Sequence, residues 1–233
     1  MSAEVPRDQR ALVAIDLGAE SCRVSLLRWV DEKPQVRLVH RFANNAVTRG
    51  DELHWDLQGI LRGLDEGLRK SAEIATEGVR SIAVDGWGVD YVRLDADGNV
   101  VSEPFCYRDQ RTVASEAALH QRISPQRMRD ITGVQLMQLN TVYQLAADAP
   151  ELQKLRWLNL PEYVLYSLGG RPVAELTTAT HTQLVGLDGK WSSEIFAALG
   201  QDEALAAEIV APGTDVGLLR GELAKLPAFA ETR

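Results

Sequence analysis

Short apolar runs dominate the first hundred residues, and their spacing predicts strands. Strand-like runs lie at residues 11–15, 24–30 and 36–42, the third of which also contains charged residues, and a fourth run lies at 81–84. Runs of this length, bounded by turn-forming residues, are typical of buried β-strands. Since only a short glycine-containing segment separates the first two runs, a β-hairpin around residues 17–21 is the simplest connection.

One long helix is predicted between the third and fourth runs. Apolar side chains recur there at the spacing that places them on one helical face, and Asp56 stands where a capping residue is expected. They are Leu57, Ile60, Leu61, Leu64 and Leu68. A helix between two strands allows them to lie parallel, so we expect the first and fourth runs to be neighbours in a mixed sheet. Residues 43–52 are predicted to form a polar loop.

The rest of the chain carries mainly helical patterns. Residues 91–94 and 100–101 flank a turn and predict a further hairpin. Helices are expected over 123–131, 141–149, 161–168, 193–199 and 202–209. Residues 1–10 predict a loose, flexible tail, and the proline- and glycine-containing residues 211–233 predict a linker or an unfinished element. The order of elements predicts an α/β domain with a mixed sheet and flanking helices.

The composition excludes several classes of protein. Of the 233 residues, 45% are apolar and 25% are charged, which excludes a mainly disordered chain. A balance of 25 Lys and Arg against 33 Asp and Glu gives a net charge of −8, which argues against nucleic-acid and anionic-membrane partners. Cys22 and Cys106 lie far apart, so we expect neither a disulfide scaffold nor a cysteine zinc site, and a reducing cytoplasm is the simplest compartment. No apolar run reaches the roughly 18 residues of a membrane span.

The segment around the predicted first hairpin contains groups suited to a phosphate. Asp16 ends a buried run, Gly18 follows in the turn, and Ser21 and Arg23 lead into the next run. Such a turn can present backbone N–H groups to phosphate oxygens, while Arg23 neutralises charge and Asp16 holds a water of hydrated Mg²⁺. The alternative is an ordinary surface hairpin in which the aspartate and glycine only form the turn.

A second segment, residues 84–91, is suited to a sugar. Trp87 offers an apolar face to a sugar ring, Gly88 leaves room for it, and Asp85 and Asp90 can accept hydrogen bonds from hydroxyls. The alternative, which the segment alone favours, is a buried tryptophan at a strand end with hydrogen-bonded aspartates.

Other polar residues carry weaker signals. Arg108 and Arg111 could bind a carboxylate or a substrate oxygen, but a capped helix start with an exposed ion pair explains them as well. The histidines have no spacing typical of metal ligands and are expected to be surface or core residues; they are His40, His54, His120 and His181.

Together these segments resemble the FGGY family of sugar kinases, and among its branches the rhamnulokinases. The resemblance rests on VAIDLGAESCRVSLL, VDGWGVDYVRLD, YRDQRT, GVQLMQLNTVYQL, LPEYVLYSLGG and ELTTATHTQLVG, in that order along residues 12–186. It implies a ribonuclease-H-like domain of the actin, hexokinase and Hsp70 superfold over 11–210. It also implies that 211–233 lead toward a missing C-terminal domain, so that residues 221–233 should pack poorly.

The resemblance also implies roles for individual residues. ATP is expected at the hairpin residues Ala19, Glu20, Ser21, Cys22 and Arg23, with Asp16 near Mg²⁺. The sugar is expected to bind at Gly88, Trp87 and Asp90. Cys22 stands where the family pattern suggests glycine, which puts nucleotide affinity in question.

The expected activity is phosphoryl transfer from ATP to the 1-hydroxyl of L-rhamnulose. The catalytic base would lie in the missing domain, so the chain alone is expected to be inactive. The alternatives are a kinase for L-fuculose or D-xylulose, or a non-catalytic actin-like module. The oligomeric state is left open.

Overall fold

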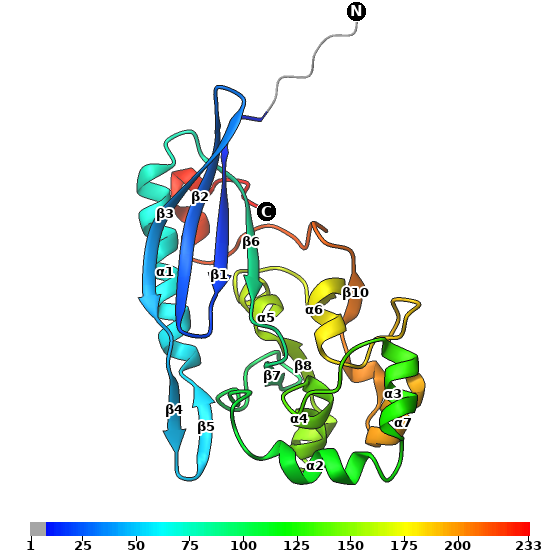
Figure 1. Cartoon of the computed structure of the whole chain (residues 1–233). Helices are drawn as coiled ribbons and strands as arrows, with labels where there is room; N and C mark the ends of the chain where they lie inside the picture. Colours follow the sequence, from blue (N-terminus) through cyan, green and yellow to red (C-terminus); the bar gives the residue numbers. More distant parts are fainter. Residues whose placement is uncertain (1–7) are drawn as a thin grey trace, which may run out of the picture.

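A four-stranded mixed sheet organises the first part of the molecule (Figure 1). The computed structural model describes residues 8–233. The sheet order is β3-β2-β1-β6. Its strands are β1 (Ala11–Leu17), β2 (Ser21–Val30), β3 (Lys33–Ala43) and β6 (Val79–Gly86). β1 pairs antiparallel with β2 and parallel with β6, so the predicted hairpin and the predicted parallel pair are both confirmed.

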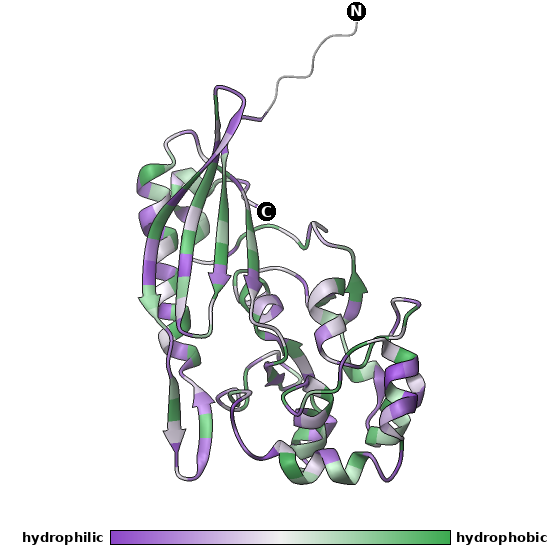
Figure 2. Cartoon of the chain, in the orientation of Figure 1, coloured by the Kyte–Doolittle hydropathy of each residue, from purple (hydrophilic) through white to green (hydrophobic). Residues whose placement is uncertain are grey.

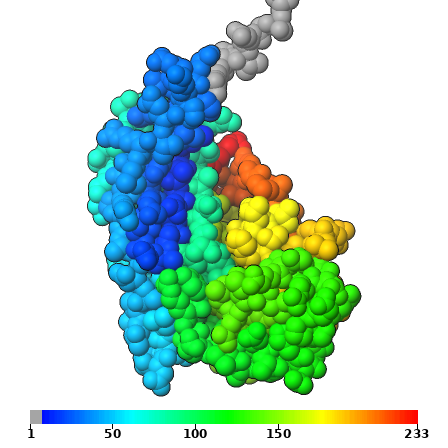
Figure 3. All heavy atoms as spheres, in the orientation of Figure 1, coloured from blue at the N-terminus to red at the C-terminus, as the bar shows by residue number. Residues whose placement is uncertain are grey.

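Helix α1 (Leu57–Ile74) covers one face of this sheet. Asp56 caps it as predicted, because its carboxylate accepts a hydrogen bond of 2.8 Å from the Gly59 N–H. The apolar face of α1 shares one core with alternate residues of β1, namely Ala11, Val13, Ile15 and Leu17. The intervening β1 residues, such as Ala14 and Asp16, are exposed on the opposite face, which Figure 3 views directly. This open face is where polar side chains of the sheet can meet a ligand.

Helices and short strands form the second part of the molecule. The helices are α2 (Thr112–Leu119), α3 (Pro125–Thr132), α4 (Thr141–Ala147), α5 (Leu160–Ser167), α6 (Leu176–His181) and α7 (Ser193–Leu199). The strands form two pairs: β7 (Tyr91–Leu94) with β8 (Arg156–Asn159), and β9 (Val173–Glu175) with β10 (Glu208–Val210). A second core lies among α2, α3, α4 and α7, with Met128, Tyr143 and Phe196 at its centre. Its separation from the first core gives the molecule two packed regions.

Three local predictions are corrected by pairings between distant segments. The expected loop 43–52 contains the hairpin of β4 (Ala46–Arg49) and β5 (Glu52–Trp55), because the buried Trp55 and a bond from the Leu53 N–H to Asp109 hold it in place. β7 pairs with β8, and the expected partner at 100–101 contributes only the bridge between Leu94 and Val100. The expected helix 202–209 is a 3₁₀ turn (Glu203–Leu205) followed by β10, since residues 208–210 pair with β9.

The expectation of poor packing for residues 221–233 is wrong. Their two 3₁₀ turns, Leu223–Lys225 and Pro227–Phe229, lie against α1 and β6, and Phe229 is only 1% exposed. The Ile82 N–H donates to the carbonyl of Arg233 at 2.7 Å, and the Thr232 hydroxyl donates to the carbonyl of Val79, also at 2.7 Å. β6 pairs with β1 along one edge only, and this segment covers its other edge, which has no neighbouring strand among residues 8–233.

Most of the expected flexible tail at residues 1–10 cannot be compared with the structure, because residues 1–7 lie outside the described residues. Among residues 8–233, none of the helices combines the length and the apolar character that crossing a bilayer requires.

Candidate functional site

The two predicted site segments leave the sheet at the same edge. In the parallel pair of β1 and β6, Asp16 lies opposite Asp85 and Leu17 lies opposite Gly86. The turn at residues 18–20 and the segment 87–88 therefore begin at neighbouring strand ends, which Figure 2 draws as hydrophilic. Ligands commonly bind at the carboxyl ends of parallel strands, so this edge is the natural place for a site built from both segments.

The hairpin turn is fixed by close backbone packing and by Asn44. A Cβ on Gly18 would collide with the carbonyl oxygen of Ser21, so the turn has no room for a side chain there. The Asn44 side-chain amide donates to the Gly18 carbonyl at 3.0 Å, and the Asn44 N–H donates to the Glu20 carbonyl, also at 3.0 Å. No local sequence pattern marks Asn44, because its role depends on the pairing of β2 with β3.

Charged side chains surround this turn on the open face. Arg23 Nη1 donates to the Asp16 carboxylate at 2.7 Å. Arg41 Nε donates to Ser21 Oγ at 3.1 Å, which brings a second guanidinium to the hairpin. Ala19 is half-buried and Glu20 is exposed at the tip. The residues predicted to bind phosphate thus lie together, and Arg41, which the sequence did not single out, lies beside them.

Cys22 lies on the other side of the strand from these charges. It is fully buried in the core beneath the sheet. Burial raises the pKa of its thiol to about 12, which keeps it protonated. Its side chain points into the core, and its Sγ meets the Gly18 carbonyl at 3.9 Å, so the thiol touches the hairpin turn from the core side and not from the open face.

The chemistry of Asp16 and Asp85 fits a hydrated Mg²⁺. Both side chains are exposed and lie side by side across the β1–β6 pair. Within residues 8–233, no cluster of three or more metal-binding side chains occurs. An ion held here would keep most of its waters, as Mg²⁺ bound with phosphates commonly does.

Gly88 is required by backbone conformation and by a neighbour from α6. Its φ is +71°, and a Cβ there would lie 2.5 Å from Nδ1 of the exposed His181. The next residue, Val89, has a φ of +62° although it is β-branched, and the Asp90 N–H closes a tight turn onto the Gly88 carbonyl at 2.8 Å. Strained backbone of this kind concentrates at functional sites. No sequence signal connected His181 to this segment.

Asp90 is fully buried beneath Trp87. Its Oδ2 accepts hydrogen bonds from the indole N–H groups of Trp55 at 2.6 Å and Trp87 at 2.9 Å, and from the Tyr107 N–H at 3.2 Å. Its Oδ1 accepts from the Gln144 amide at 2.8 Å. Burial raises the pKa of this carboxyl to about 6. Asp90 therefore orients Trp87 from below, and a sugar hydroxyl would reach it only if these donors moved.

The arginines after Tyr107 serve the packing of the domain. Arg111 Nη1 donates to Asp148 at 2.6 Å, and Arg93 Nε donates to the same buried carboxylate at 2.8 Å. The exposed Arg108 lies over the ring of Tyr107, 4.7 Å from its centroid. Asp109 accepts from two backbone N–H groups. This cluster joins the β4–β5 hairpin to the helical region.

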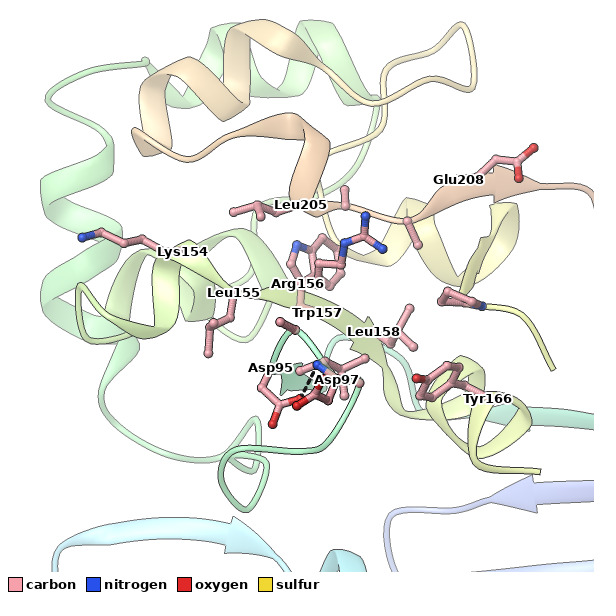
Figure 4. Close-up of a pocket in the computed structure, with 16 residues that line it drawn as sticks. Asp95, Asp97, Lys154, Leu155, Arg156, Trp157, Leu158, Tyr166, Leu205 and Glu208 are labelled. Atoms are coloured by element: carbon pink, nitrogen blue, oxygen red, sulfur yellow. Dashed lines mark hydrogen bonds between the residues drawn. The ribbon is translucent and has the colours of Figure 1, made fainter. Parts of the chain in front are cut away.

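The cavity in Figure 4, about 660 Å³ in volume, is lined by none of the predicted site residues. Its walls come from the turn at 95–98, from β8 and from residues 205–208. Within the described residues, the buried indole N–H of Trp157 in its wall has no hydrogen-bond acceptor. Asp95 accepts hydrogen bonds from its own turn, so the carboxylate stabilises the loop.

Comparisons with known proteins extend over nearly the whole chain. Residues 11–232 match the FGGY family of carbohydrate kinases, N-terminal domain. The chain is 38% identical over 216 residues to a rhamnulokinase of Pectobacterium carotovorum, which covers 88% of the chain and 43% of that relative. It is 33% identical over 219 residues to a rhamnulokinase of Bacteroides thetaiotaomicron, which covers 91% of the chain and 45% of that relative. The chain thus spans less than half the length of these relatives.

Solved structures support the fold. A xylulose kinase from Lactobacillus acidophilus superposes with a TM-score of 0.82 at 15% identity, over 95% of this chain and 46% of its own. A glycerol kinase from Plasmodium falciparum, solved with ADP, superposes with a TM-score of 0.77 at 14% identity, over 95% of this chain and 47% of its own. At these identities the likeness concerns the fold alone, which is the actin-like, ribonuclease-H-like fold that the resemblance implied. The chain belongs to the FGGY family of carbohydrate kinases and corresponds to its N-terminal domain.

Proposed function

We propose that the chain is the N-terminal part of an ATP-dependent kinase that phosphorylates the 1-hydroxyl of L-rhamnulose. The observation that carries this proposal is the common edge of β1 and β6, where Asp16 lies opposite Asp85 and a phosphate-type turn adjoins the Trp87–Gly88 segment. Phosphoryl transfer requires a donor and an acceptor held in line, and adjacent sites at one sheet edge meet that requirement. The identity of 33–39% to curated rhamnulokinases supports the choice of ketose.

The proposed roles follow from the position of each group. The backbone of the turn from Ala19 to Cys22 and the Arg23 guanidinium bind phosphate oxygens. Trp87 and Gly88 form the floor for the sugar, and Asp90 holds the Trp87 indole in place. Mg²⁺, held through water at Asp16, would neutralise phosphate charge.

The proton acceptor for the sugar hydroxyl is proposed to lie in a second domain. Of the aspartates near the site, Asp90 and Asp109 already accept hydrogen bonds from the protein. Asp16 is likewise already engaged, in an ion pair with Arg23. The chain alone is therefore expected to bind its ligands and to turn over weakly or not at all.

The test combines binding and turnover on the 233-residue chain. Calorimetry with L-rhamnulose is expected to give saturable binding that exceeds the binding of L-fuculose and D-xylulose. A coupled ADP-release assay with Mg-ATP is expected to give little product. If another ketose binds more tightly than L-rhamnulose, that ketose replaces L-rhamnulose as the proposed substrate. If the chain binds neither a ketose nor ATP, the result favours a non-catalytic module. Turnover at about 1–100 per second would show that the catalytic base lies within this chain, and Asp16 and Asp85 would be the first candidates for it.

A further inference from the structure

Four charged residues form a row across the sheet beside the hairpin. The strand register places Asp85 opposite Asp16, Asp16 opposite Arg23, and Arg23 opposite Arg41. Directly opposed residues point to the same face of a sheet, so all four side chains lie on the open face. This charged row therefore has two carboxylates at one end and two guanidinium groups at the other.

Only one of the two opposed arginines forms an ion pair with a carboxylate of the row. Like charges directly opposite each other on neighbouring strands destabilise a sheet. Arg23 is paired with Asp16. Arg41 forms no ion pair with any carboxylate among residues 8–233, and its hydrogen bond goes to the uncharged Ser21 hydroxyl. The Arg41 guanidinium, at the cationic end of the charged row, is thus exposed and has no ion-pair partner among the described residues.

Both guanidinium groups are oriented toward the hairpin turn. Ser21 accepts from Arg41 Nε at its Oγ, and Arg23 Nη1 lies 3.4 Å from its carbonyl oxygen. Arg23 Nη1 also lies 3.2 Å from where a Cβ on Gly18 would stand. With Nε engaged by Ser21, the terminal nitrogens of Arg41 remain available. A polyphosphate has several oxygens a few ångströms apart and can accept hydrogen bonds from two neighbouring guanidinium groups at once.

We propose that Arg41 is a second cationic phosphate ligand, which binds the polyphosphate of a nucleoside triphosphate together with Arg23. This inference rests on the proposed function, because it assigns a further residue to the same phosphate site. Ser21 then acts as the positioning residue, since its hydroxyl holds Arg41 over the turn. The bound anion supplies the negative charge that the opposed arginines lack.

The experiment measures tripolyphosphate binding to the 233-residue chain by ³¹P NMR titration. The unaltered chain is compared with the variants Arg23→Ala, Arg41→Ala, Arg41→Gln and Arg41→Lys. Arg37→Ala is the control, because Arg37 is an exposed cation on the same strand but outside the charged row. Thermal unfolding of each variant separates lost binding from lost folding.

Saturable binding is expected for the unaltered chain. Arg23→Ala, Arg41→Ala and Arg41→Gln should each weaken it about tenfold or more, the range for losing a charge-assisted hydrogen bond. Arg41→Lys should retain most of the affinity, and Arg37→Ala should leave it unchanged.

Three results would overturn the inference. Normal binding by Arg41→Ala with weakened binding by Arg23→Ala would remove Arg41 from the site and leave the proposed function standing. Normal binding by Arg41→Gln with weakened binding by Arg41→Ala would show that the charge of Arg41 is not needed. Arg41 would then only support the turn through a hydrogen bond. Absence of saturable binding by the unaltered chain would overturn both the phosphate site and the proposed function.

Discussion

Arg23 Nη1 lies 2.7 Å from the Asp16 carboxylate, across a directly opposed pair of the β1–β2 ladder. The sequence alone suggests separate roles for these residues, Arg23 as a phosphate ligand and Asp16 near a metal ion. The pair shows that the two roles are coupled, because each side chain orients the other beside the turn. Both side chains are partly exposed, so the ion pair itself contributes little to stability and its value lies in positioning.

Replacement of Arg23 by alanine is expected to weaken ATP binding. It removes a cation beside the hairpin and leaves the Asp16 carboxylate unpaired next to the phosphates. The expected loss is on the order of 1.5–3 kcal/mol in binding free energy. Calorimetric titration with Mg-ATP measures it, and Arg23→Lys, which keeps the charge, should lose less. An unaltered ATP affinity in Arg23→Ala would refute the phosphate-site assignment.

Replacement of Gly88 by valine is expected to abolish ketose binding. Valine would have to adopt the left-handed backbone conformation of Gly88, which is unfavourable for a β-branched residue. Its side chain would also collide with the His181 ring, since even a Cβ would lie 2.5 Å from Nδ1. Titration with L-rhamnulose measures the loss, and ATP binding should persist because the hairpin is a separate segment.

The double variant Gly88→Ala/His181→Ala separates the two causes of that loss. Removing the imidazole relieves the collision but leaves the strain of a positive φ, which costs on the order of 1 kcal/mol or more. Ketose binding that survives Gly88→Val unchanged would mean that this segment serves the fold alone.

Local sequence patterns predicted the elements whose contacts are close in the chain. The period of Leu57, Ile60 and Leu64 predicted α1, and Asp56 predicted its start. The glycine turn between two apolar runs predicted the β1–β2 hairpin. In each case the residues that show the sequence pattern also form the hydrogen bonds of the element, because they are close together in the chain.

Distant pairings could not be predicted in this way. Strand β10 forms because residues 208–210 meet β9, although their apolar spacing resembles a helix. Asn44, Arg41 and His181 reach the candidate site only through the tertiary fold. For Asp90 the sequence left two roles open, and the four donors around its carboxylate explain its burial without a ligand.

Replacement of Asp90 by asparagine is expected to destabilise the fold. An amide presents only one oxygen, so its NH₂ group must face donors that now bond a carboxylate oxygen. The expected loss is on the order of 1–3 kcal/mol of unfolding free energy. Urea unfolding followed by tryptophan fluorescence measures it, because Trp55 and Trp87 both donate to this carboxylate. Unchanged stability would show that the donors find other acceptors at no cost.

Replacement of Phe229 by alanine is expected to destabilise the first core. Phe229 packs against α1 and β6 and is almost completely buried, so its removal leaves a cavity worth about 3–5 kcal/mol. The exposed Leu218, which lies just before this segment, provides the control variant Leu218→Ala, which should change stability by less than about 1 kcal/mol. Equal midpoints of urea unfolding for the two variants would contradict the structural role assigned to residues 221–233.

Glu162, in the first turn of α5, is a buried carboxyl with one unsatisfied oxygen. Its Oε1 accepts a hydrogen bond from the Glu175 N–H at 3.1 Å, whereas Oε2 has no partner among residues 8–233. Burial, with a smaller contribution from the nearby Glu175 charge, raises its pKa from 4.5 to about 7. The folded protein therefore binds this proton more tightly than the unfolded chain does.

The sign of the resulting pH dependence follows from linkage. Between pH 4.5 and about 7 the folded state keeps the Glu162 proton while the unfolded chain loses it, so this group makes stability fall as pH rises. Glu162→Gln cannot ionise and should remove that fall, which gives a relative gain over the unaltered chain on the order of 2–3 kcal/mol at pH 7. Urea unfolding at pH 4.5, 6 and 7.5 measures the difference, with exposed Glu73→Gln as the control. A difference between variant and parent that stays constant over this range would mean that Glu162 titrates alike in the folded and unfolded states.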